Sequence, residues 1–132
     1  MRIHSVGLQG LIGPAFALAI CGSASAQEGN YGPPSPTAAE IAKAKSGVLN
    51  QLIDPESGRL QDVFFKRNGP YPTFCGAVNG KNKVGGYVGA QPFIVFGNDV
   101  TVYQGRPGTQ AAFTRMWSLA CAGGQQVQLP NF

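Results

Sequence analysis

One short stretch gathers most of the residues that could hold a ligand. Residues 74–89 read FCGAVNGKNKVGGYVG, with five glycines and two lysines in sixteen positions. Consecutive glycine amides can converge on a phosphate or a carboxylate, and neighbouring lysines would add positive charge. The residues that we expect to contact an envelope protein or a polar, anionic ligand are Asn79, Lys81, Asn82, Gly85, Gly86 and Tyr87. The stretch would also serve as a plain turn between two strands, because Asn and Gly tolerate positive φ.

The sequence offers little for catalysis. Its single histidine is His4, which lies in a leader that we expect to be removed. A mature chain without histidine cannot run a Ser-His-Asp or Cys-His mechanism, and it cannot build a histidine-containing zinc site. We therefore favour a non-enzymatic protein with no metal and no cofactor. The alternative is a hydrolase that acts on envelope material through carboxylates from Asp54, Glu56 or Asp62.

Residues 1–26 have the pattern of a secretory signal peptide. A short basic start precedes an apolar stretch over residues 6–20, and Ala24-Ser25-Ala26 offers a small-x-small cleavage site. The apolar stretch is too short and too interrupted to span a membrane. We therefore predict a periplasmic or secreted protein without a transmembrane span after signal removal. In the alternative, Cys21 would be lipidated, because the sequence LAIC loosely resembles a bacterial lipoprotein box.

The charge balance indicates which partners are excluded. The formal net charge is +4, and removal of Arg2 with the leader would leave nine basic and six acidic residues, or +3. This excess is too small to indicate nucleic-acid binding, and the sequence contains no long basic run. A weak preference for anionic surfaces or ligands is compatible with it.

Two cysteines remain after the leader, Cys75 and Cys121. In an exported chain, two cysteines indicate one disulfide. Closing a loop of this length would contribute about 4 kcal/mol in the chain-entropy picture. Two buried free thiols are the alternative, whereas a redox role is disfavoured because no C-x-x-C motif is present.

The elements that position these residues follow from the pattern of apolar and turn residues. Residues 27–36 are rich in Gly, Pro and polar groups, which is typical of a flexible linker. Thr37 and Glu40 form a capping box that predicts a helix start, and Pro55 predicts the helix end. We expect helices over 37–53 and 110–121, with strands over 59–67, 73–79, 86–96 and 100–104 between them.

This order predicts an α+β fold in which an N-terminal helix precedes a four-stranded antiparallel meander and a C-terminal helix packs on the sheet. Both helices are expected on one face. A single domain would cover 37–124, and the tail over 125–132 would either add an edge strand or stay loose. Along the second strand Phe74 and Cys75 face opposite ways. Cys121 shares the apolar face of the last helix, so it can lie over Cys75.

Three stretches carry a resemblance to a group of small exported bacterial proteins of unknown function. They are DPESGRLQDV (54–63), CGAVNGKNKVGGYVG (75–89) and the F-x-x-x-W-x-x-x-C spacing over 113–121. The shared pattern is DPxS…CGxVNxKNxxGGYxG…C, and Leu60 stands where an aromatic residue is expected. The resemblance supports pairing Cys75 with Cys121 and implies no catalytic residues. We expect a binding or structural module of the cell envelope, or alternatively an inhibitor of an envelope enzyme.

Overall fold

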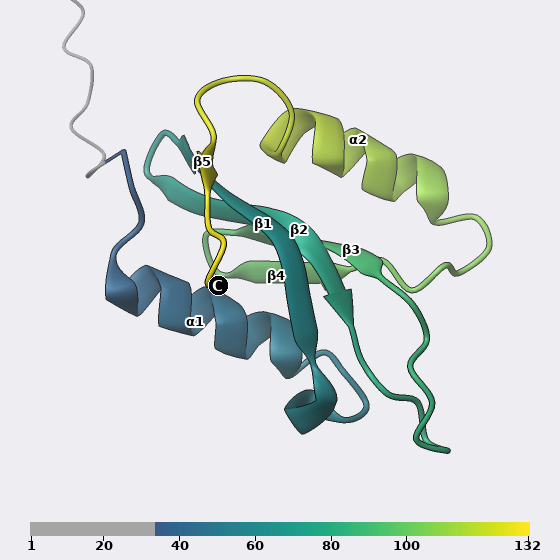
Figure 1. The fold of residues 1–132 in the computed structure, drawn as a ribbon. Helices are drawn as coiled ribbons and strands as arrows, with labels where there is room; N and C mark the ends of the chain where they lie inside the picture. The colour runs from purple at the N-terminus through teal and green to yellow at the C-terminus, as the bar shows by residue number, and fades with distance from the viewer. Residues whose placement is uncertain (1–33) are drawn as a thin grey trace, which may run out of the picture.

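The computed structural model describes residues 34–132. The expected signal peptide, Cys21 and most of the linker lie outside the described residues. Neither helix among residues 34–132 has the length and apolar character of a membrane span. Two helices pack on a five-stranded antiparallel sheet (Figure 1). The elements are α1 (Ala38–Leu49), η1 (Pro55–Ser57), β1 (Arg59–Asn68), β2 (Tyr71–Asn79), β3 (Gln91–Phe96), β4 (Asp99–Val102), α2 (Gln110–Ala120) and β5 (Val127–Gln128).

The predicted α+β class, the meander and the disulfide are confirmed, but the sheet has five strands instead of four, because the tail adds the edge strand that was one of its two expected arrangements. The strand order across the sheet is β4-β3-β2-β1-β5. Residues 127 and 128 add the fifth strand by pairing with Phe65 and Phe64 of β1. The following residues also pack on the body, since the ring of Phe132 lies 5.5 Å from that of Phe74. Burial of these apolar side chains explains why the tail is held against the sheet.

The two helices lie on opposite faces of the sheet, which corrects the expectation that both would gather on one face (Figure 1). Phe74 belongs to a core shared with Ala44 and Val48 of α1. Cys75, the next residue along β2, points the other way and packs with α2. Successive strand residues face opposite sides, so a helix bonded to Cys75 cannot share a face with a helix packed on Phe74.

The capping box at the start of α1 is confirmed. The Thr37 hydroxyl accepts from the Glu40 amide at 3.2 Å, and a Glu40 carboxylate oxygen accepts from the Thr37 amide at 2.9 Å. The same carboxylate pairs with the Arg67 guanidinium of β1 at 2.8 Å, which ties the helix start to the sheet. The helix ends at Leu49 instead of residue 53, because the amides of Gln51 and Leu52 bond three residues back and tighten the last turn.

The third strand is shorter than predicted. It begins at Gln91 instead of residue 86, and the chain before it turns away from the sheet. Positive φ values of 84° at Gly85 and 96° at Gly89 bend the backbone there, and only glycine adopts these values without strain. The residues between β2 and β3 therefore form a separate feature, which we call the hairpin arm (residues 80–90).

Candidate functional site

The hairpin arm carries most of the residues that the sequence singled out. Figure 1 shows it running out beyond the sheet from the ends of β2 and β3. Residues 83–90 are all exposed. Lys81 and Tyr87 form an isolated antiparallel bridge, and the Val88 amide donates to the Gly80 carbonyl at 3.2 Å. The arm is thus a short ladder closed by a turn.

The turn at the tip is built around Asn82. Its backbone amide donates to the Gly86 carbonyl at 2.8 Å, and its carbonyl accepts from the Gly85 amide at 3.0 Å. Its side-chain Oδ1 accepts from the amides of Val84 and Gly86 at 3.1 and 3.0 Å. The amides of Val84, Gly85 and Gly86 therefore donate to oxygens of Asn82. They do not converge on an open site for an anion. Asn79 acts in the same way at the other end, where Oδ1 accepts from the Gly89 amide at 3.0 Å.

The base of the arm is clamped to the segment that precedes β1. The Lys81 amide donates to Ser57 Oγ at 2.8 Å, and that hydroxyl donates to the Asp54 carbonyl at 2.8 Å. Gly80 is buried, and a Cβ at this position would lie 3.1 Å from the Leu52 side chain. The sequence DPES (54–57), which predicted the end of the first helix, therefore also positions the arm.

The exposed surface of the arm combines an aromatic ring with cations. The Tyr87 side chain is 38% exposed. The Arg59 guanidinium lies 4.4 Å from the centre of its ring, and the Lys81 ammonium lies 5.6 Å from it. Val84 at the tip is 90% exposed. Tyrosine and arginine are enriched where protein interfaces concentrate their binding energy, which makes this group the strongest candidate contact surface.

The structure divides the six expected contact residues by role. Lys81 and Tyr87 present side chains that a partner could touch. The bracing of the arm depends on the other four, which are Asn79, Asn82, Gly85 and Gly86. Sequence reasoning missed Arg59 and Ser57, which lie more than twenty residues before the arm and reach it only through the fold.

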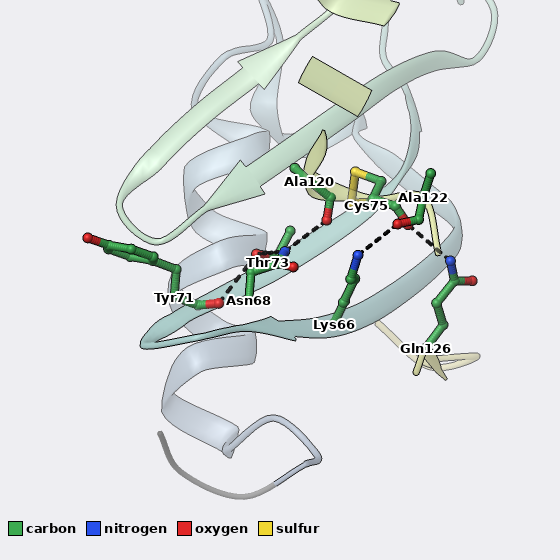
Figure 2. The surroundings of a disulfide bond; sticks show 9 residues. Lys66, Asn68, Tyr71, Thr73, Cys75, Ala120, Ala122 and Gln126 are labelled. Atoms are coloured by element: carbon green, nitrogen blue, oxygen red, sulfur yellow. Dashed lines mark hydrogen bonds between the residues drawn. A yellow bond between two sulfur atoms is a disulfide. The ribbon is translucent and has the colours of Figure 1, made fainter. Parts of the chain in front are cut away.

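The predicted disulfide joins Cys75 of β2 to Cys121 at the end of α2, with the two Cα atoms 6.1 Å apart. Both residues are fully buried. Figure 2 shows the surroundings, where side chains of Asn68, Gln126 and Lys66 donate to carbonyls at the end of α2 and just beyond it. The pairs are Asn68 Nδ2 to Ala120 at 2.8 Å, Gln126 Nε2 to Cys121 at 3.0 Å and Lys66 Nζ to Ala122 at 2.7 Å. They satisfy carbonyls that a helix end leaves unpaired.

The carboxylates of the alternative, hydrolytic hypothesis occupy different local settings. Asp54 precedes η1, and Asp62 lies exposed at a bulge in β1 with a φ of 53°. The hollow that Asp62 lines and the hollow that Glu40 lines each contain one acidic side chain. Across residues 34–132 no group of three or more His, Cys, Asp or Glu side chains is arranged to hold a metal ion.

Comparison with known proteins does not indicate a function, so a proposal for the function has to rest on the geometry of the hairpin arm and its neighbours. No protein-family model, curated protein or solved structure matched the chain.

Proposed function

We propose that this protein is an exported, non-enzymatic binding module of the bacterial cell envelope, and that the hairpin arm contacts its partner. The observation that carries the proposal is the Arg59–Tyr87–Lys81 group, an exposed aromatic ring flanked by two cations. Tyr87 and Lys81 belong to the arm and Arg59 begins β1, and none of the three is part of the apolar core.

The bracing of the arm supports a binding role. An unbraced loop loses conformational entropy when it docks, and that loss weakens association. Here the tip is fixed by Asn82, and the base is fixed by Ser57. The contact surface is therefore preorganised, as a recognition element requires.

The charge of this region indicates the character of the partner. No acidic residue occurs between Asp62 and Asp99, whereas the arm carries Lys81 and Lys83 and is flanked by Arg59. Like charges placed opposite each other disfavour association. The partner surface is accordingly polar or anionic.

Export is supported by the disulfide. Disulfides persist in oxidising compartments and are rare in the cytosol of most organisms. Together with the leader pattern of residues 1–26, the Cys75–Cys121 bond favours a periplasmic or secreted location.

Capture from the native envelope fraction tests the proposal. Lys81→Ala removes a cation beside Tyr87 but keeps the backbone bond to Ser57, so we expect weaker capture and an unchanged thermal midpoint. Lys45→Ala is the matched control, because Lys45 is exposed on α1, away from the arm. Equal loss of capture in both variants, or a lower midpoint with capture retained, would contradict a contact role for the arm.

A further inference from the structure

The edge strand β4 offers unpaired backbone groups. Among residues 34–132 it pairs with β3 alone, on one side. The Tyr103 amide, just beyond β4, donates to the Pro92 carbonyl at 2.9 Å. Backbone groups alternate in direction along a strand, so the amides and carbonyls of Val100 and Val102 point to the open side.

From Val100 onward this edge lacks the protection that edge strands usually carry. Charged residues, prolines and bulges normally prevent such strands from pairing with other chains. Asp99 at the start of β4 is the one charged residue of this strand, and residues 100–104 read VTVYQ, with no charge and no proline. The opposite edge of the sheet is protected, because β5 covers part of β1 and Asp62 forms a charged bulge.

A groove of about 360 Å³ runs along the open side of β4. All five residues 100–104 line it. Their side chains alternate between the two faces of the sheet, so a hollow that touches all five lies at the strand edge. Its outer wall is α2, through Phe113 and the 42% exposed Met116. The groove therefore combines free main-chain groups with an apolar wall.

Positive charge lies at one end of this groove, beyond Gln104. Arg106 lines it, and the whole chain from residue 100 to residue 132 contains two arginines and no acidic residue. Gln51 and Gln104 line both this groove and a neighbouring hollow of about 220 Å³, which also includes Lys81. A segment lying along β4 would meet both cations at the Gln104 end of the strand, whereas Asp99 lies at its other end.

We propose that the groove binds an extended, acidic segment of a partner protein, which adds as a sixth strand beside β4. Its main chain bonds to the amides and carbonyls of Val100 and Val102, as in other cases of strand addition. An apolar side chain packs on Phe113 and Met116, and carboxylates lie near Arg106 and Lys81. A second copy of this chain is a poorer occupant, because it carries the same net positive charge.

Selection from a random heptapeptide library displayed on phage, with the disulfide-bonded protein as bait, tests the proposal. We expect enrichment of proline-free sequences that contain Asp or Glu beside β-branched residues. An enriched peptide should protect the Val102 amide from hydrogen exchange. Enrichment of basic sequences, no enrichment at all, or protection confined to the hairpin arm would overturn the proposal.

Three variants separate this groove from the arm. Arg106→Ala should weaken the enriched peptide roughly fivefold, whereas Arg115→Ala, on an exposed part of α2 outside the groove, should not. Tyr87→Ala should leave peptide binding unchanged, because Tyr87 does not line the groove. The proposal for the groove can therefore be disproved without disproving the proposal for the arm. Equal affinity of the Arg106 and Arg115 variants, or a dimer joined through β4 in sedimentation and exchange measurements, would contradict the assignment.

Discussion

The Arg59 guanidinium lies 4.4 Å from the centre of the Tyr87 ring, although the two residues are 28 positions apart in sequence. The contact joins the first residue of β1 to the hairpin arm. It brings a cation onto the exposed aromatic side chain of a segment that projects from the sheet. We infer that this pair is the centre of the contact surface.

Replacement of Tyr87 separates binding from folding. Tyr87→Ala removes a partly exposed ring and its cation–π contacts, so we expect a loss of about 1 kcal/mol or less in unfolding free energy. Capture of envelope partners should be abolished. Tyr87→Phe keeps the ring and should retain most capture. Chemical denaturation and the capture assay measure the two effects, and equal capture by wild type and Tyr87→Ala would rule out a contact role for the ring.

Asn82 is expected to control the order of the arm. Asn82→Ala removes the acceptor of the Val84 and Gly86 amides. These amides are exposed, so water replaces the lost acceptor and the global stability should change by about 1 kcal/mol or less. Hydrogen exchange should nevertheless accelerate at residues 84 and 86. Lys83→Ala is the control within the arm, and similar exchange in both variants would show that the side chain of Asn82 does not brace the turn.

The disulfide should dominate the attachment of α2. The buried cluster beneath this helix is small, with Ile94, Ala120 and the two bonded cysteines at its centre. Cys75→Ala combined with Cys121→Ala should lower the unfolding free energy by about 4 kcal/mol, as expected for a loop of this size. Urea denaturation followed by Trp117 fluorescence measures the change. Unaltered stability of the double variant would contradict this assignment.

The ion pair between α1 and β1 predicts a loss of stability in acid. The side-chain hydrogen bond from Arg67 lowers the pKa of Glu40 below its usual value of 4.5. A depressed folded-state pKa contributes stability that is present above the unfolded value and is lost as the pH falls through the folded value. We therefore expect the midpoint of urea unfolding to drop below about pH 4.5.

Glu40→Gln is the matched control for this pH dependence. Glutamine can still accept from the Thr37 amide, so the cap is retained while the titrating group is removed. The variant should be less stable than wild type at pH 7. The difference in unfolding free energy between the two proteins should become smaller towards pH 3. A gap that is constant with pH would show that the Glu40–Arg67 pair does not produce the effect.

Local patterns predicted local structure well. The Thr37–Glu40 capping box needs only residues three apart, and the alternation of Phe74 and Cys75 along β2 follows from strand geometry. The disulfide was predictable because only two cysteines remain after the leader. That alternation already implied that the two helices lie on opposite faces of the sheet. The prediction that both helices share one face did not take it into account.

The sequence predicted which segment carries the candidate site, but not the role of each residue in it. Asn and Gly residues marked the turn, but their division into bracing and contact roles depends on which amides Asn82 accepts. Arg59 reaches Tyr87 only because β1 and β2 pair in a register that places Arg59 opposite Asn79. Ser57 reaches Lys81 for a similar reason. Contacts of this kind depend on strand register and on the path of the chain, so no spacing of residues in the sequence predicts them.

Site-specific photocrosslinking tests the contact role of the arm most directly. A photoreactive residue is placed at Val84, the exposed tip of the arm, and in a second version at Lys45 on α1. Irradiation of cells that export each version is followed by mass spectrometry of the adducts. We expect a discrete adduct from position 84 that position 45 does not give and that Tyr87→Ala removes. Identical adducts from both positions, or none from position 84, would contradict a partner-binding arm.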